Sequence, residues 1–264
     1  MKNKVIIALV DGMRPDGMWA SGHPFFERLK KESTCCFDAQ TITRPITLPA
    51  HISLFTGVDH LHHENTDNDW HPYPVDYKGI LESCHDAGLK TAMMVTWPPL
   101  MHLGKLESID KMDYIRFDTP DKTFEDRKDF ERMYAARTAD AVRADEYDFM
   151  FYYFEMADVV GHEEGWMSPH YIEALNCAGE CLQTVYEALQ PDQNFILMAD
   201  HGGEGLKHNR PESVATMTIP VFMHGPAFEA GREAHGWNIL DIAPTVHRLL
   251  GIDIPDTYQG RSVL

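Results

Sequence analysis

The sequence predicts an α/β protein with a doubly wound, mainly parallel central sheet and helices on both faces. Continuous apolar runs of strand length alternate with stretches of helical periodicity over most of the chain. Such runs are typical of strands that are buried on both faces, as they are in parallel sheets. The 264 residues are enough for one large domain, so a single domain covering residues 1–264 is expected.

The individual elements follow one another in chain order. Strands are expected at Val5–Val10, Lys90–Val95, Tyr147–Phe154, Asn194–Met198 and Ile219–Met223. Helices are expected at Pro49–Thr56, Tyr77–Asp86, Phe124–Arg143, Pro169–Leu189 and Ile239–Leu250. The segment from 97 to 122 has few apolar residues, which predicts a surface excursion or a small cap on the domain.

The charge of the chain argues against some classes of partner. Lys and Arg number 23 against 41 Asp and Glu, so the formal net charge is −18. Nucleic acids and anionic membranes both favour a basic protein face, so neither a nucleic acid polymer nor a membrane is expected as a partner. A small phosphate-bearing substrate stays compatible with this charge, because a bound cation reverses the local field.

The start of the chain and its cysteines favour a cytoplasmic protein. The apolar run Val5–Val10 ends at Asp11, too early for the apolar region of a signal peptide, so a first buried strand is expected instead. No other stretch approaches the roughly 18 apolar residues of a membrane span. The five cysteines form no Cys-x-x-Cys motif, and reduced, mostly buried thiols are expected.

Three aspartates stand at the ends of apolar runs: Asp11, Asp158 and Asp200. Ligand sites in open α/β sheets lie outside the carboxyl ends of the strands, so these side chains are expected to converge. Carboxylates this close repel one another and need a cation or a proton between them. A single Asp after a strand is usually a turn or N-cap residue, but three of them, two with histidines nearby, favour a metal site.

The histidines near these aspartates narrow the choice of metal. His162 follows Asp158 by four residues, His201 follows Asp200 directly, and His208 lies after a glycine-rich loop. Carboxylate and imidazole ligands together suit zinc or another first-row metal, whereas calcium prefers oxygen ligands alone. Other histidines are expected to be loop residues near the site (His60, His62, His63, His71) or ordinary surface and core residues (His85, His102, His170, His247).

A proline-bounded segment precedes the first long helix of the chain. Prolines 45 and 49 hold the backbone extended around Thr47, and a helix is expected to open immediately after this residue. A hydroxyl at a helix N-terminus faces free backbone N–H groups, which suit a phosphoryl oxygen. Taken alone, Thr47 fits better as the N-cap of that helix.

Together these segments resemble the alkaline phosphatase superfamily, most closely its nucleotide pyrophosphatase/phosphodiesterase branch, the type I phosphodiesterases. The resemblance is carried by Val-Asp-Gly at 10–12, Thr-Leu-Pro-Ala-His-Ile-Ser-Leu-Phe-Thr-Gly at 47–57, Asp-Val-Val-Gly-His at 158–162, and Asp-His-Gly-Gly at 200–203 with His208. It covers nearly the whole chain in the family's order. It implies an alkaline phosphatase-like fold and a metal-dependent hydrolase of phosphodiester or pyrophosphate bonds.

The same resemblance implies two divalent metal ions, usually zinc, although manganese occurs in the mutase branch. One ion would be held by Asp158, His162 and His208. The second would be held by Asp11, Asp200 and His201, with the Thr47 hydroxyl completing its shell. Thr47 would attack the phosphorus atom and form a phospho-threonine that water then hydrolyses.

An asparagine is implied as a further catalytic residue. Asn68 matches the asparagine with which phosphodiesterase relatives hold a phosphoryl oxygen. Asn65 competes for this role, because the family has a glycine after the histidines where this chain has Glu64.

The branches of the superfamily differ in residues that this chain has or lacks. Sulfatases need a modifiable Cys or Ser followed by an arginine, and the equivalent stretch Thr47–His51 has neither, so sulfatase activity is not expected. Alkaline phosphatases proper place an arginine close behind the nucleophile, and none occurs between Thr47 and Asn68. Arg14 follows Asp11 closely and is expected to form a surface ion pair, with a phosphate contact as the alternative.

The leading hypothesis is therefore a di-metal hydrolase of phosphodiester or pyrophosphate bonds in a small substrate, with nucleotides among the candidates. A phosphomonoesterase, phosphonate hydrolase or phosphotransferase on the same scaffold is the alternative. A non-catalytic metal- or ligand-binding protein is the hypothesis from a different class. The sequence leaves the oligomeric state open.

Overall fold

A central sheet of seven strands organises the molecule. The computed structural model describes residues 4–69, 77–117 and 122–264. The sheet order is β2-β7-β6-β1-β5-β3-β4. In these residues β7 is antiparallel to both of its neighbours, β6 and β2, and the other pairings are parallel. The strands are β1 Lys4–Val10, β2 Thr34–Gln40, β3 Thr91–Val95, β4 Lys111–Tyr114, β5 Phe149–Phe154, β6 Gln193–Met198 and β7 Thr218–His224.

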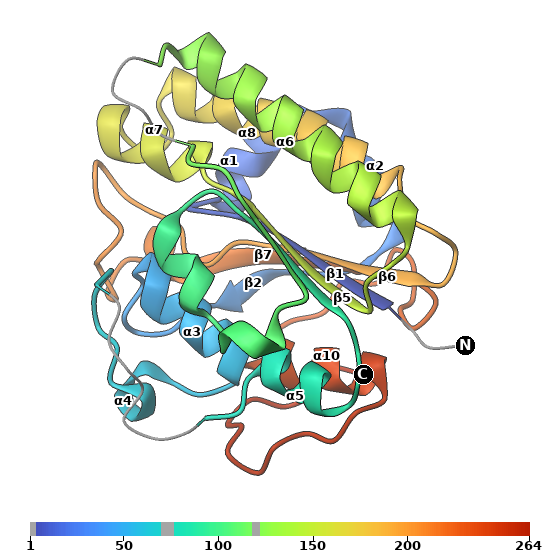
Figure 1. Cartoon of the computed structure of the whole chain (residues 1–264). Helices are drawn as coiled ribbons and strands as arrows, with labels where there is room; N and C mark the ends of the chain where they lie inside the picture. The colour runs from blue at the N-terminus through green and yellow to red at the C-terminus, as the bar shows by residue number, and fades with distance from the viewer. Residues whose placement is uncertain (1–3, 70–76, 118–121) are drawn as a thin grey trace.

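Helices cover both faces of this sheet, which confirms the predicted fold class (Figure 1). On one face lie α1 Pro15–Ala20, α2 Pro24–Glu32, α6 Phe124–Ala144, α7 Met156–Glu164 and α8 Pro169–Tyr186. On the other lie α3 Thr47–Thr56, α4 His60–His63, α5 Ile80–Asp86 and α10 Ile242–Leu250. Short connections add α9 Val214–Met217 and the 3₁₀ turns Pro98–His102, Leu106–Ser108 and Ile239–Asp241.

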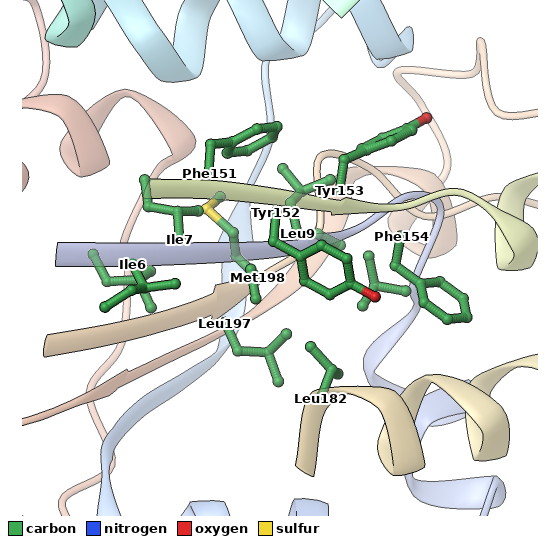
Figure 2. Close-up of a cluster of buried hydrophobic side chains, with 14 of the residues drawn as sticks. Ile6, Ile7, Leu9, Phe151, Tyr152, Tyr153, Phe154, Leu182, Leu197 and Met198 are labelled. Carbon is green, nitrogen blue, oxygen red and sulfur yellow. The ribbon is translucent and has the colours of Figure 1, made fainter. Parts of the chain in front are cut away.

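Aromatic residues of β5 fill the core on both faces of the sheet. Phe151 and Tyr153 point to one face, whereas Tyr152 and Phe154 point to the other, beside Leu182 of α8 (Figure 2). Successive side chains of a strand alternate between faces, so an unbroken apolar run here means burial on both sides. The Phe151 ring packs edge-on against Phe55 of α3 at a centroid distance of 5.1 Å.

Two strands of the sheet were not predicted from the sequence. β2 and β4 are the edge strands, and each carries polar residues that mask the apolar pattern. Charged side chains are common on edge strands, because they discourage pairing with other chains. The segment expected to form an excursion or small cap contains two of the 3₁₀ turns and then β4, which extends the sheet beside β3.

Most apolar residues of the described chain are buried in this core. Within the described ranges, no helix combines the length and the apolar character needed to cross a membrane. All five cysteines are buried and have free thiols.

Candidate active site

The three predicted aspartates lie along one edge of the sheet. Asp11 follows β1 directly, and Asp200 is the second residue after β6. The apolar run before Asp158 is divided: β5 ends at Phe154, and Asp158 lies in the first turn of α7. Since β1, β5 and β6 are adjacent and parallel, their carboxyl ends bring the three carboxylates to the same place.

A first group of candidate metal ligands joins α7 to the loop after β6. Asp158, His162 and His208 each offer one ligand atom, and these atoms lie within 4.8 Å of one another. The spacing of four residues places Asp158 and His162 on one face of α7, with His162 Nε2 3.5 Å from Asp158 Oδ2. His208 Nε2 is 4.0 Å from Asp158 Oδ1.

A second group is buried beneath the first and consists of Asp11, Asp200 and His201. His201 Nε2 lies 3.4 Å from Asp11 Oδ1 and 3.3 Å from Asp200 Oδ2. The hydroxyl of Thr47 approaches the same nitrogen, at 3.3 Å. Thr47 therefore faces the second group, and the six residues implied as ligands fall into two neighbouring sets of three.

Hydrogen bonds fix the orientation of the three imidazoles. The Nδ1 atoms of His162, His201 and His208 lie 3.0, 2.9 and 2.6 Å from the backbone carbonyl oxygens of Leu206, Gly202 and Pro45. A carbonyl only accepts, so each Nδ1 carries the proton and donates it. The Nε2 lone pairs are thereby left for a metal, as in typical histidine metal ligands.

The electrostatics of the carboxylates fit bound cations. Burial, together with neighbouring carboxylates, raises the pKa of Asp11 and Asp158 well above its ordinary value. Burial raises the pKa of Asp200 to about 7. Each of the three also has one buried oxygen without a hydrogen-bond partner among the described residues: Asp11 Oδ1, Asp158 Oδ1 and Asp200 Oδ2. Three crowded, under-satisfied carboxylates with neutral imidazoles are the donor set expected of a first-row metal site.

Several residues that support the candidate ligands were not predicted from the sequence. The Tyr153 hydroxyl donates to Asp11 Oδ2. Trp166 Nε1 and the Tyr171 hydroxyl both donate to the carbonyl of Gly12, at 3.0 and 2.8 Å. β5 contains two adjacent buried tyrosines, and a buried tyrosine hydroxyl usually has a polar partner, which was the available signal for Tyr153.

Two glycines allow close packing at the site. Gly12 has φ +68°, a left-handed conformation, and a Cβ there would lie 3.2 Å from an oxygen of Asp158. A Cβ on Gly203 would lie 2.1 Å from the Trp166 ring. Larger residues at these positions would displace α7 or Trp166 from the candidate ligands.

Thr47 is the first residue of α3. The N-cap position is occupied by Ile46 and not by Thr47, and the Ile46 side chain makes no capping hydrogen bond. The prediction that Thr47 is the N-cap is therefore wrong. Thr47 is 4% exposed, and its carbonyl accepts from His51 Nδ1 at 2.7 Å. The hydroxyl is thus directed at the second candidate metal group and not at its own backbone.

The two asparagines weighed from the sequence lie in different environments. Asn68 is exposed, and its Oδ1 accepts from the backbone N–H of Leu48 at 3.0 Å, so its amide NH₂ is adjacent to the start of α3. Asn65 is buried, and its Nδ2 donates to the carbonyl of His63. Glu64 has φ 59°, so it adopts the left-handed conformation that glycine favours at the corresponding family position.

A cavity of about 430 Å³ opens beside these groups. Its walls include Asn68, His162 and His208 together with Ile46, Asp67, Leu206, Lys207 and Asn209.

Of the four histidines expected near the site, His60 and His63 are buried and His62 is exposed around α4, and His71 lies outside the described residues. Arg14 bonds to Asp16 through Nε and NH2 and to the Gly203 carbonyl through NH1, as expected of an ion-paired residue.

The fold and the site together define an alkaline phosphatase-like phosphoesterase scaffold with two candidate metal groups beside a threonine. The family model described as type I phosphodiesterase / nucleotide pyrophosphatase matches residues 5–220. The chain therefore belongs to this family, and the resemblance inferred from the sequence is confirmed.

Relatives from two branches share parts of the sequence. The venom phosphodiesterase of Naja atra is 23% identical over 244 residues, which cover 84% of this chain and 29% of the venom protein. The 2,3-bisphosphoglycerate-independent phosphoglycerate mutase of Vibrio atlanticus is 30% identical over 125 residues, 46% of this chain and 24% of the mutase. The matches thus cover only 24% to 29% of the length of these curated relatives.

Solved structures share the fold. Murine ectonucleotide pyrophosphatase/phosphodiesterase 5, solved as an inactive variant in complex with AMP, superposes with a TM-score of 0.77 at 17% identity, covering 96% of each chain. A 2-O GAG sulfatase gives a TM-score of 0.80 at 14% identity and covers all of this chain and 73% of the sulfatase. At these identities the likeness concerns the fold alone.

Proposed function

We propose that the protein hydrolyses phosphodiester or pyrophosphate bonds of small substrates, using two divalent metal ions and Thr47 as the nucleophile. The observation that carries this proposal is the position of Thr47 Oγ1, 3.3 Å from His201 Nε2 and at the edge of two neighbouring ligand groups. A protein that merely binds metal has no need of a hydroxyl in this position.

The residues that would hold the two ions are the two groups already described. Asp158, His162 and His208 would hold one, and Asp11, Asp200 and His201 the other, with Thr47 beside it. Zinc suits this mixture of imidazole and carboxylate, and manganese is the alternative. Two such ions lower the pKa of a bound hydroxyl and stabilise the charge on the leaving oxygen of an in-line displacement.

The reaction proceeds in two steps on Thr47. Its hydroxyl loses a proton and attacks phosphorus, a bond forms from Oγ1 to phosphorus, and the bond to the leaving oxygen breaks, so the first product departs with that oxygen and takes up a proton. Water then attacks the phosphorus atom of the phosphorylated Thr47, the bond from Oγ1 to phosphorus breaks, Oγ1 regains a proton from the water, and the phosphate monoester departs. A threonine hydroxyl needs an activated environment of this kind, since it is a weak nucleophile at neutral pH.

Asn68 would bind a non-bridging phosphoryl oxygen in the transition state. The Leu48 N–H holds the Asn68 carbonyl oxygen, so the amide NH₂ is fixed beside Thr47 as a donor. A donor held in place before the reaction stabilises developing charge without the cost of reorienting.

The substrate class follows from the charges around the nucleophile. Monoester dianions gain from a nearby arginine, and this chain has none between Thr47 and Asn68. Arg14 is already engaged by Asp16 and the Gly203 carbonyl. Diesters are therefore preferred, and the murine relative solved with AMP supports a nucleotide-like substituent, for which the cavity of about 430 Å³ offers space.

Metal content and two chromogenic esters test this function. Protein purified without chelators is analysed for metals and assayed with bis-p-nitrophenyl phosphate and p-nitrophenyl phosphate. About two metal ions per chain and a higher kcat/KM for the diester support the proposal. Metal without turnover of either ester would indicate a binding protein, and a clear monoester preference would indicate a phosphatase.

A further inference from the structure

The inference concerns a buried carboxylate outside both ligand groups, Glu131 of α6. Glu131 is 0% exposed, and its Oε1 accepts two backbone N–H bonds, from Glu155 and Met156, both at 3.1 Å. Glu155 is the N-cap of α7 and Met156 is its first residue. Glu131 therefore caps α7 from a different helix.

This cap fulfils a need of α7 that its own sequence leaves unmet. The first N–H groups of a helix have no partner within the helix, and Glu155 makes no side-chain cap. An acceptor oxygen at this end satisfies these N–H groups and lies at the positive end of the helix dipole. A buried carboxylate is costly, and Glu131 Oε2 has no hydrogen-bond partner among the described residues, so the position is not explained by apolar packing.

The same face of α6 also holds the other end of α7. Arg127 precedes Glu131 by four residues, and it forms two hydrogen bonds with Glu163, at 2.6 and 2.8 Å. Glu163 belongs to the last turn of α7, directly after His162. Figure 1 shows α7 beside one end of the long helix α6. Glu131 and Arg127 thus fix both ends of α7.

Two candidate ligands of one metal site, Asp158 and His162, lie between these two ends of α7. Asp158 is in the first turn of α7 and His162 in its last, and α7 contributes no ligand to the second group. We propose that Glu131 is a positioning residue for the Asp158–His162–His208 site, setting its metal affinity through the N-terminus of α7 and leaving the Asp11–Asp200–His201 site unaffected. This inference rests on the proposed two-metal function.

Zinc titration of the purified, metal-depleted protein against a chromophoric chelator tests it without an activity assay. In Glu131→Ala, one of the two ions is expected to bind at least about ten-fold more weakly, the size typical of residues that support metal ligands. Glu131→Gln keeps an acceptor oxygen and is expected to bind within about three-fold of the parent. Arg132→Ala is the matched control, because Arg132 of α6 pairs with Asp129 and Glu180, neither of which belongs to α7.

A double variant identifies which ion is affected. His162→Ala is expected to lose the ion of the first group, and adding Glu131→Ala to it should leave the affinity of the remaining ion unchanged. Equal weakening of both ions, or parental affinity in Glu131→Ala, would overturn the positioning role. If Glu131→Ala does not fold, Arg127→Ala decides: about three-fold weaker binding of the first-group ion supports the proposal, and unchanged binding overturns it. A parent protein that binds no ion would instead contradict the proposed function itself.

Discussion

The imidazole rings of His201 and His208 stack face to face, with centroids 3.9 Å apart and an angle of 9° between the ring planes. His201 belongs to the buried ligand group and His208 to the more accessible one. The two rings come from a single loop, so the loop after β6 joins the two groups physically. This contact brings the two candidate metal positions next to each other, as the proposed mechanism with two ions acting on a single phosphate requires.

Removal of a buried ligand is expected to cost one metal ion and the activity together. Asp200→Ala and His201→Ala each delete a ligand at 0% exposure, yet both residues lie at the rim of the sheet, so the fold should persist. Elemental analysis should show about one ion per chain in each variant, and turnover should fall by at least about 10³-fold.

Circular dichroism of the same preparations provides the control for folding. Treatment of the parent with a strong chelator should abolish turnover, and added zinc or manganese should restore it. Variants that lose their fold even with excess metal would mark Asp200 and His201 as structural residues.

The Asn68 amide is expected to contribute mainly to the transition state. Asn68→Ala removes the donor beside Thr47 and should lower kcat for a diester by about 10²-fold with a smaller change in KM. Asn68→Asp keeps the acceptor for the Leu48 N–H but replaces the donor by an oxygen, so it should lose as much activity as the alanine variant. An Asp variant with near-parental rate would show that Asn68 only orders the backbone.

Arg14 is expected to have little influence on substrate choice. Its guanidinium pairs with Asp16 and the Gly203 carbonyl, so Arg14→Ala should keep the diester preference and change kcat/KM by less than about ten-fold for either ester. Kinetics of both esters with the parent and the variant provide the measurement. A parental preference for monoesters that collapses in Arg14→Ala would assign a phosphate-binding role to this arginine.

Acid is expected to destabilise the fold partly through a histidine that is not a candidate ligand. Burial lowers the pKa of His63 to about 4, and its Nε2 lies 3.0 Å from Ser53 Oγ. An unfolded histidine titrates near 6.5, so the unfolded chain binds more protons between pH 6.5 and 4. The stability due to the neutral ring is therefore fully present above pH 6.5 and is lost as the pH falls towards 4, and the loss between pH 7 and pH 5 amounts to roughly 2 kcal/mol.

Urea unfolding of the metal-depleted protein at pH 7 and pH 5 measures this loss. In His63→Gln the loss between the two values should shrink, whereas in His85→Gln, which changes an exposed histidine, it should match the parent. An unchanged loss in His63→Gln would show that other buried histidines dominate the acid response.

The strands could be predicted from the sequence where the local pattern and the tertiary role agree. β1, β5 and β6 are buried on both faces, so their apolar runs are unbroken and the residues after them point to one edge. The apolar run before Asp158 predicts a strand up to that residue, but α7 begins inside the run, at Met156. Met156 and Ala157 are buried in the helix as they would be in a strand, so their apolar character does not reveal where the strand ends. The edge strand β4 carries Lys111 and Asp113, which conceal its strand pattern.

Other parts of the site depend on contacts between distant segments and leave little local signal. In the sequence, Glu131 is indistinguishable from the other charged residues of a long amphipathic helix. Its role as a cap of α7 becomes visible only where α6 packs against α7. Trp166 follows the glycine at the end of α7, and its contact with the Gly12 carbonyl joins residues 154 positions apart. Glu64 has a left-handed backbone conformation at a position where the family has glycine. The conformation is thus retained without glycine, because the surrounding fold stabilises it.

In the proposed mechanism, Thr47 forms a covalent bond with the phosphorus atom of the substrate. Rapid-quench mass spectrometry of the metal-loaded protein with bis-p-nitrophenyl phosphate tests it most directly, with peptide mapping of any adduct. We expect a p-nitrophenyl phosphoryl adduct on Thr47 of the parent. Thr47→Ala should show no adduct and no turnover but retain both ions, and Thr47→Ser should keep partial activity. Near-parental turnover by Thr47→Ala would contradict a covalent mechanism, because water would then attack the substrate directly.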